Sequence, residues 1–362
     1  MEKISKIYRY RPELDGLRFI AIISVLLYHA KFSFLGKSDW FSGGYIGVDI
    51  FFVLSGFLIT NSIFKEIKNN KKFDFLNFYE RRLRRILPIL ITVLAVSTVL
   101  AWRILIFNDL VEFGRSGIST FLFVSNYFFH NVTSKYGADS SLLKPLLHTW
   151  SLSVEVQFYL IYPIVLFLIY KLLKTNTQII IFLFFLISLQ FSEILLIKDP
   201  DLNYFHTLSR IWEFAFGSLI AYSHRFFNYE KRNFLTDLLP LLGLYLISYS
   251  ILFFDDKTNH PGFITIIPIL GLFFLISFSS KEELVGKILG LKPFVLIGRI
   301  SYSAYLWHYP FFAFCRIQNP DISNKSKIYL IIISLLVSLI SYQLIEKPFQ
   351  HTINKKLFYL II

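Results

Sequence analysis

The sequence predicts an all-α polytopic membrane protein with about ten transmembrane helices and both termini cytosolic. Hydrophobic residues make up 55% of the 362 residues, and the mean hydropathy is +0.56. They gather in apolar runs of about 20 residues, long enough to cross roughly 30 Å of hydrocarbon as helices. The formal net charge is +13, but the cations lie between these runs, which argues against a nucleic-acid partner.

The expected spans follow the apolar runs in order. Most Lys and Arg residues fall before the first span and after each even-numbered one, as the positive-inside rule expects of cytosolic segments. The outer stretch 108–147 contains an aromatic run, Thr120–Phe129, that we expect to form a re-entrant or interfacial helix. The ten spans are expected at about residues 17–36, 46–64, 86–107, 148–170, 178–196, 206–224, 236–254, 262–279, 294–315 and 327–345.

We expect residues 1–362 to form a single membrane domain without an appended soluble domain. The small-residue site of a cleavable signal is missing after Ala30. The single cysteine, Cys315, excludes an internal disulfide, and no metal site is expected around it.

The first span carries Arg18 near its start and His29 about three turns further along. At 100° per residue, His29 returns to within about 20° of the direction of Arg18, roughly 16 Å along the helix. An ionisable side chain at membrane depth is costly, so His29 is a functional candidate. The alternative is a neutral imidazole hydrogen-bonded to a neighbouring helix.

The second span opens with the glycine-rich segment 43–47, which allows close backbone approach, and Asp49 follows it into apolar surroundings. Asp49 is expected either to orient His29 and raise its basicity, as a general base requires, or to cap the helix N-terminus. Gly56 is typical of a helix-packing notch. Ser55 lacks the flanking glycine of a hydrolase nucleophile elbow and is not assigned as a nucleophile.

Arg82 and Arg85 lie three residues apart on one expected helical face before the third span. Their planar guanidinium groups suit phosphate oxygens, which favours an anionic cytosolic cosubstrate. The alternative is that they only anchor the topology.

Later spans carry further polar stripes. In the fourth, His148, Ser151 and Glu155 share a face, with Glu155 about 10 Å from the outer boundary. In the sixth, Arg210 and Glu213 indicate an intramembrane ion pair of structural character.

In the ninth span, Tyr305 and His308 share a face, with Trp307 beside them. These three are candidate acceptor-binding residues. The alternative is an aromatic belt at the membrane interface.

Together these segments resemble the acyltransferase-3 family of integral membrane O-acyltransferases, from about Arg11 to Phe349. Each matching piece is weak alone, and their common order makes the resemblance specific. The family pattern shows a second Glu after Glu155, where this chain has Val156. The pieces are Arg18-x10-His29, the segment from Gly47 to Thr60, Arg82-x-x-Arg85-Ile-x-Pro, the segment from Trp150 to Glu155, Tyr305-Leu-Trp-His308-Tyr-Pro and Glu346-Lys-Pro-Phe349.

The resemblance implies a multi-pass enzyme of the cytoplasmic (inner) membrane. It would move an acyl group, foremost acetyl, from cytosolic acyl-CoA to a hydroxyl of a cell-envelope polysaccharide, lipopolysaccharide or glycolipid. Some relatives carry an extracytoplasmic hydrolase-like domain after the last span; here transfer is expected within the membrane domain or with a separate protein. The implied roles are general base or transient acyl carrier for His29, its orientation for Asp49 or Glu155, and CoA binding for Arg18, Arg82 and Arg85.

Two other classes of protein compete with this interpretation. A secondary transporter or flippase would use intramembrane His, Asp and Glu to relay protons or bind substrate, but no half-repeat of interrupted helices is visible. A non-catalytic scaffold of a polysaccharide assembly would leave His29 unexplained. Turnover of acetyl-CoA by the purified protein separates the enzyme from both.

Overall fold

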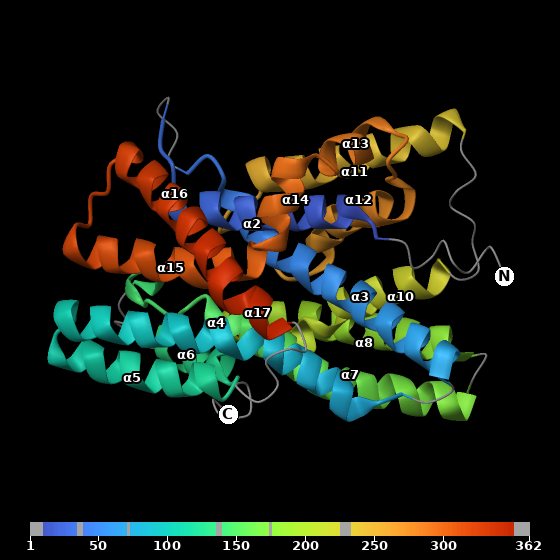
Figure 1. Ribbon diagram of the computed structural model, residues 1–362, viewed down its shortest axis with the longest axis horizontal. Helices are drawn as coiled ribbons and strands as arrows, with labels where there is room; N and C mark the ends of the chain where they lie inside the picture. The colour runs from blue at the N-terminus through green and yellow to red at the C-terminus, as the bar shows by residue number, and fades with distance from the viewer. Residues whose placement is uncertain are drawn as a thin grey trace. The chain divides into compact units, whose positions relative to one another are not determined.

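The computed structural model describes residues 10–34, 39–70, 73–134, 140–173, 176–224 and 233–350. Within these ranges the chain forms helices and loops without a β-strand, which confirms the predicted all-α class (Figure 1). The chain divides into two compact units, Met1–Phe73 with Tyr162–Ser301, and Asp74–Ile161 with Tyr302–Ile362. One membrane domain over the whole chain stays a prediction. The basic segments 225–232 and 351–356, expected in the cytosol, lie outside the described residues.

The first unit is built from residues before and after the second unit in the sequence. Helix α7 continues into it from Tyr162 onward. Its helices are α2 (Pro12–Ala30), η2 (Ser42–Tyr45), α3 (Ile46–Asn70), α8 (Thr177–Lys198), α9 (Pro200–Phe205), η5 (Thr207–Ser209), α10 (Ile211–Ser223), α11 (Phe234–Phe253), η6 (Phe263–Thr265), α12 (Ile266–Phe278), α13 (Leu284–Leu289) and α14 (Lys292–Arg299).

The second unit combines a central stretch of the chain with its last helices. A network of hydroxyl groups ties α5, α6 and α7 together: Thr149 bonds Thr120 at 2.8 Å and Ser125 at 3.1 Å, and Ser125 bonds Ser153 at 2.7 Å. Its helices are α4 (Phe75–Ile104), α5 (Phe107–Phe121), α6 (Ser125–Thr133), η3 (Ser141–Leu143), the first part of α7 (Thr149–Leu173), α15 (Ser301–Gln318), α16 (Asn324–Ser341), the π-helix η7 (Tyr342–Glu346) and α17 (Lys347–Gln350).

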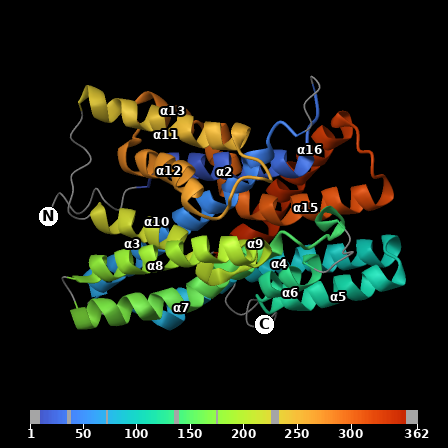
Figure 2. The same ribbon diagram turned by 180° about the vertical axis from the view of Figure 1, so that it is seen from behind.

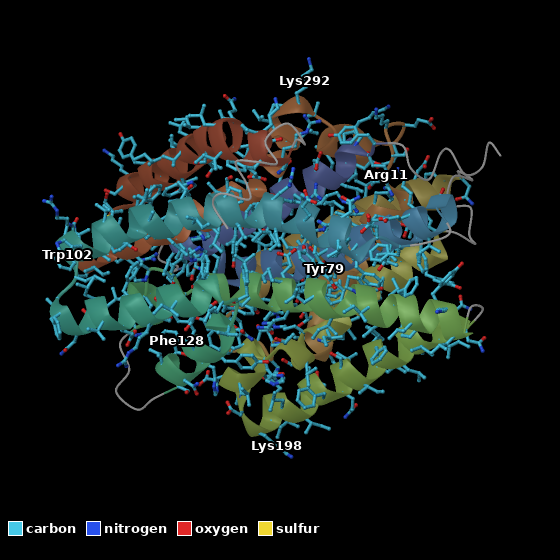
Figure 3. The ribbon with its side chains drawn as sticks, turned by 60° about the horizontal axis from the view of Figure 1, so that its bottom comes forward. Arg11, Tyr79, Trp102, Phe128, Lys198 and Lys292 are labelled. Atoms are coloured by element: carbon cyan, nitrogen blue, oxygen red, sulfur yellow. The ribbon has the colours of Figure 1, made fainter. Side chains whose placement is uncertain are left out.

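Six helices in the described part of the chain are long and apolar enough to cross a membrane. Large apolar side chains remain exposed on them; Trp102, labelled in Figure 3 near the end of α4, is 74% exposed. Such surfaces fit contact with lipid better than contact with water. The chain is thus a multi-pass helical membrane protein, while the count of ten spans and the side of each terminus stay predictions. The six candidates are Ser42–Ile67, Phe75–Ile104, Thr149–Leu172, Thr177–Lys198, Thr236–Phe253 and Asn324–Gln350.

The first predicted span is displaced, because α2 begins at Pro12 and ends at Ala30 instead of covering 17–36. Proline at the first helical position starts the helix ahead of the apolar run. Lys31 ends it in the left-handed conformation with a φ of 51°. His29 therefore lies in the last turn of α2 rather than in the middle of a span.

Two further expectations are corrected. The ninth predicted span, 294–315, is two helices, since α14 ends at Arg299 and α15 begins at Ser301. The aromatic run Thr120–Phe129 is not one helix either, because the chain breaks between α5 and α6, where Phe123 has a φ of 55°. Hydropathy reports only that a run is apolar and does not show turns of one to three residues inside it.

Helices α3 and α10 pack closely in the first unit, and α8 lies along α10 (Figure 2). Two glycines allow this approach: a Cβ at Gly56 would lie 2.0 Å from the carbonyl oxygen of Phe214, and one at Gly217 would lie 2.0 Å from that of Val53. Gly56 is therefore a packing notch, as predicted. Buried apolar side chains around this contact, among them Trp212, form the core of the unit.

Candidate functional site

The candidate residues fall into both units, so different sets of helices position them. Arg18, His29 and Asp49 belong to the first unit. The second unit holds Arg82, Arg85, Glu155, Tyr305, Trp307 and His308.

Asp49 is fully buried and binds side chains from distant parts of the chain. Its Oδ1 accepts a hydrogen bond from Arg210 Nη1 at 2.9 Å, and its Oδ2 accepts one from His260 Nε2 at 2.9 Å. Arg210 Nη1 also donates to Glu213 Oε1 at 3.1 Å, which confirms the predicted ion pair. We call these four residues the Asp49 cluster; none of their side chains is more than 5% exposed.

Arg210 is held at the start of α10 by the preceding short helix. Its Nε and Nη2 each donate to the carbonyl oxygen of Tyr204 at 3.1 Å, and its guanidinium lies 5.0 Å from the Tyr204 ring. Asp49 stands in the first turn of α3, where the helix N-terminus also favours a carboxylate. The ion pair of Asp49 is observed, whereas its role as a helix cap stays a prediction.

His260 is the member of the cluster that the sequence did not reveal. It lies in the loop between α11 and η6, with the rings of Tyr45 and Tyr204 at 4.5 Å and 6.1 Å. Burial and the neighbouring Arg210 guanidinium lower the pKa of His260 well below its ordinary value. The ring is therefore neutral at pH 7, and its Nε2–H is the proton donated to Asp49. A lone histidine in a polar loop carries no signal of this pairing.

Both carboxylate oxygens of Asp49 bind partners other than His29, namely Arg210 and His260, and the expected orientation of His29 by Asp49 stays a prediction. His29 is half-buried, and its ring lies 5.0 Å from that of Tyr28. The ring centroids of Tyr28 and Tyr45 lie 5.7 Å apart, and the Tyr45 ring in turn lies beside the ring of His260. His29 and the Asp49 cluster therefore lie toward the same end of the first unit, linked by two tyrosine rings. The catalytic role of His29 stays a prediction.

Arg18 is bound within α2, where its Nη1 lies 2.5 Å from Asp15 Oδ1. Asp15 Oδ2 accepts a hydrogen bond from Tyr10 at 2.7 Å and lies 3.7 Å from Arg299 Nε. Arg18 thus has a local acidic partner that the apolar pattern did not indicate. Its role in binding a cosubstrate stays a prediction.

Arg82 and Arg85 stand in the first half of α4. The Arg82 guanidinium lies 5.4 Å from the centroid of the Tyr159 ring. Within the described part of the chain neither guanidinium forms an ion pair, whereas Arg84 between them binds Glu80 at 2.6 Å. Arg82 and Arg85 therefore keep hydrogen-bond donors for an anion. Arg84 differs from them, because its guanidinium already binds a carboxylate.

Glu155 lies on α7 and accepts a hydrogen bond from Tyr159, one turn further along. Its carboxylate interacts electrostatically with both Arg82 and Arg85. The second unit therefore places the predicted acid beside the predicted arginines, although the sequence assigned them separate roles.

Glu346 is a further buried acid near Arg85, and it is 1% exposed. It accepts hydrogen bonds from Ser303 Oγ at 2.6 Å and Gln350 Nε2 at 3.0 Å. The residue ends the π-helix η7, a distortion that often marks functional positions. The sequence showed Glu346 in a matching motif without indicating its burial, because a π-turn shifts the face that an α-helical pattern predicts.

His308 is fully buried on α15, and its Nδ1 donates to the carbonyl oxygen of Tyr305 at 2.7 Å. In a neutral ring this leaves Nε2 as an acceptor. The ring of His148 lies 5.6 Å away, and Tyr305 Oη donates to the His148 carbonyl at 2.8 Å. The polar stripe of α7 therefore meets the predicted face of α15.

Trp307 is 4% exposed, and its Nε1 donates to Ser341 Oγ at 2.8 Å. This burial does not fit the exposed aromatic belt considered for Trp307. Binding of an acceptor by Tyr305, Trp307 and His308 stays a prediction.

The fold and these buried polar groups define a multi-pass helical membrane protein with ionisable side chains inside its helical units. The family model described as an acyltransferase domain matches residues 11–347. The chain belongs to the acyltransferase-3 family, which confirms the resemblance seen in the sequence and, at the level of the domain, the predicted class of enzyme.

The chain is similar to O-acetyltransferase OatA of Staphylococcus aureus strain NCTC 8325 / PS 47, with 31% identity over 366 residues. That match covers 96% of this chain and 59% of OatA. A putative O-acetyltransferase from strain MSSA476 is 30% identical over 356 residues, covering 94% of this chain and 58% of the relative. The chain thus spans less than two thirds of the length of these relatives. No solved structure matches the chain.

Proposed function

We propose that the protein is an O-acyltransferase of the cytoplasmic membrane. It moves an acyl group, foremost acetyl, from cytosolic acyl-CoA to a hydroxyl of a cell-envelope polysaccharide or glycolipid. The family match over residues 11–347 carries this proposal. The names of the two relatives, both O-acetyltransferases, support acetyl as the transferred group.

The arginines of α4 support an anionic donor. Arg82 is packed against Tyr159, which orders its guanidinium without using its hydrogen-bond donors. CoA carries phosphates that such planar groups bind in a bidentate manner. Glu155 acts electrostatically on both arginines, but Glu346 acts on Arg85, so a phosphate would compete with one more carboxylate at Arg85 than at Arg82. We therefore assign the stronger phosphate contact to Arg82.

His29 is the proposed reacting group. As a general base, its imidazole takes the proton of the acceptor hydroxyl while the oxygen attacks the thioester carbonyl; the C–S bond breaks, and the proton passes to the CoA thiolate. As an acyl carrier, its unprotonated nitrogen attacks the thioester, so that a C–N bond forms while the C–S bond breaks and the CoA thiolate leaves; the acceptor hydroxyl then attacks the acyl group, the C–N bond breaks, and the hydroxyl proton passes to the CoA thiolate. The half-buried position of His29 at the end of α2 supports access by a substrate.

The test is turnover of radiolabelled acetyl-CoA by the purified protein in lipid nanodiscs, with a soluble glycan and a glycolipid as separate acceptors. We expect free CoA and an alkali-labile acetyl ester to form in equal amounts. CoA release without an acceptor would identify hydrolysis or a stable acyl-enzyme. Absence of CoA release with every acceptor, from protein that binds acetyl-CoA, would contradict the proposal.

A flippase or proton-coupled transporter is a second candidate, because the Asp49 cluster places four ionisable groups inside the first unit. Such a protein would move the glycolipid across liposomes without consuming acetyl-CoA. Glycolipid movement independent of acetyl-CoA, together with no ester formation, would favour this candidate.

A further inference from the structure

The Asp49 cluster contains more acid than base. In their ordinary ionic states at pH 7, Asp49 and Glu213 carry one negative charge each, Arg210 carries one positive charge, and neutral His260 carries none. One negative charge is left over among side chains that are at most 5% exposed. An uncompensated charge in such surroundings is strongly unfavourable.

Glu213 shows where the imbalance lies. Its Oε1 accepts a hydrogen bond from Arg210, but its Oε2 is buried and receives none from any donor in the described part of the chain. Asp49 Oδ1 and Glu213 Oε1 both accept a hydrogen bond from the same nitrogen, Arg210 Nη1, at 2.9 Å and 3.1 Å, so the two carboxyl groups lie side by side. Two ionised carboxylates offer only acceptors at such a contact, whereas a single proton makes one of them a donor.

Other ways to neutralise the cluster fit less well. Arg210 supplies one positive charge, and its Nη1 is already shared between the two carboxylates at 2.9 Å and 3.1 Å. It therefore does not neutralise both of them. His260 Nε2 lies 3.5 Å from the same Nη1, which disfavours an imidazolium there. No group of three His, Cys, Asp or Glu side chains in the described ranges is arranged to hold a metal ion.

We propose that Asp49 and Glu213 share one bound proton, held between Arg210 and His260, so that the cluster is a neutral proton-binding site in the first unit. This goes beyond the proposed acyl transfer and does not depend on it. Because the ordinary pKa of Asp and Glu is about 4, the unfolded chain gives up this proton at pH 7. Unfolding therefore releases a proton, and stability falls as the pH rises.

Titratable groups from the neighbouring elements also face the cluster. They are Tyr45 from η2, Tyr204 from α9, and Asp255 and Asp256 from the loop before His260. These two aspartates are exposed to solvent and differ from the buried pair in that respect.

Infrared spectroscopy tests the site directly, without acyl-CoA. A protonated carboxylic acid has a carbonyl stretching band apart from the amide bands, and this band shifts in D2O. We expect the wild-type protein to keep such a band at about pH 8, far above the ordinary pKa of Asp and Glu. Glu213→Gln should remove it, because the neutral amide replaces the acid and donates to Asp49 instead.

Glu346→Gln is the matched control, since Glu346 is equally buried but accepts two hydrogen bonds. It should leave the band unchanged. Asp49→Asn should also remove the band, because a single remaining carboxylate opposite Arg210 needs no proton. A wild-type spectrum without the band, or a band removed by Glu346→Gln and kept in Glu213→Gln, would overturn the proposal.

The pH dependence of unfolding gives an independent measurement. In the wild type the unfolding equilibrium constant should rise about tenfold per pH unit between about pH 6 and 8, relative to Glu213→Gln. Equal slopes in the two proteins would contradict a bound proton. If both cluster variants fail to fold, the wild-type spectrum at about pH 8 tests the proposal by itself: a protonated carboxylic acid band supports a bound proton, and its absence contradicts one.

Discussion

Arg210 and Asp49 form a buried ion pair at 2.9 Å although they are 161 positions apart in the sequence. Each side chain is only 1% exposed. The pair joins the start of α10 to the first turn of α3, beside the glycine contacts of the same two helices. Charge and packing therefore act on one helix crossing, and both can be tested by substitution.

Arg210→Ala should lower the free energy of unfolding by about 3–5 kcal/mol, because it leaves two buried carboxyl groups without their cation. Arg210→Lys should restore only part of the loss, since an ammonium does not reproduce the guanidinium contacts. Unfolding in detergent followed by intrinsic fluorescence measures both. Arg103→Ala, at an exposed site in α4, is the control. Equal stability of the two Ala variants would mean that the pair is not formed.

Gly56→Ala should destabilise the crossing of α3 and α10, because the added Cβ would lie 2.0 Å from the carbonyl oxygen of Phe214. The expected cost is about 1–3 kcal/mol. Gly114→Ala in α5 is the matched control, since nothing lies within 4 Å of its added Cβ. It should be neutral or stabilise by up to about 1 kcal/mol, because Ala favours a helix over Gly. The unfolding temperature should therefore fall in Gly56→Ala and stay the same or rise in Gly114→Ala.

Much of the fold follows from the apolar pattern, since a helix stands at or near every predicted span. The pattern fails where a helix is ended by local geometry rather than by polarity. Lys31 ends α2 with a left-handed backbone, and Ile300 separates α14 from α15 inside one apolar run. Hydropathy averaged over about 19 residues does not resolve such single-residue events.

The site was predictable to a smaller extent. Arg210 and Glu213 are a local pair, three residues apart, and the helical period was enough to predict it. The partners of Asp49 come from 161 and 211 positions away, a separation that no local spacing encodes. From the sequence, His29 was therefore the expected histidine partner of Asp49, whereas in the structure His260 forms a hydrogen bond with Asp49.

Replacing both Arg82 and Arg85 by Ala should weaken acetyl-CoA binding at least tenfold, since a hydrogen bond to a charged group contributes about 1.5–3 kcal/mol. Lys at both positions should restore the affinity only partly. Arg81→Ala, an exposed neighbour on the same helix, is the control. Isothermal titration in nanodiscs measures all three. An unchanged Kd in the double Ala variant would leave these arginines as topology anchors.

Cysteine labelling should place Asp256 and Asn319 outside the cell and Lys281 in the cytosol. The positive-inside distribution predicts this arrangement, and all three positions are exposed. Single cysteines are introduced after Cys315→Ser, and intact cells are treated with a membrane-impermeant maleimide. Modification of the cysteine at Lys281 before permeabilisation would contradict the predicted orientation.

His29→Ala should abolish acyl transfer while leaving acetyl-CoA binding nearly intact. Loss of a general base costs about 10²- to 10⁴-fold in rate, and loss of an acyl carrier removes the reaction altogether. Thermal unfolding should change little, because His29 is half-buried in the last turn of α2 and the carboxylate of Asp49 is held by Arg210 and His260. His224→Gln is the matched control, a half-buried histidine of the same unit, and should stay active.

His29→Gln separates a chemical role from a structural one. Glutamine keeps a hydrogen-bonding side chain but neither accepts the proton at neutral pH nor carries an acyl group, so this variant should be nearly as inactive as His29→Ala. A structural histidine would behave differently: Gln would restore activity, and Ala would lower stability by leaving a polar partner unpaired. Full ester formation by His29→Gln would therefore end the catalytic assignment. The search for the base would then move to Glu155 and His308, each already placed beside other polar side chains in the second unit.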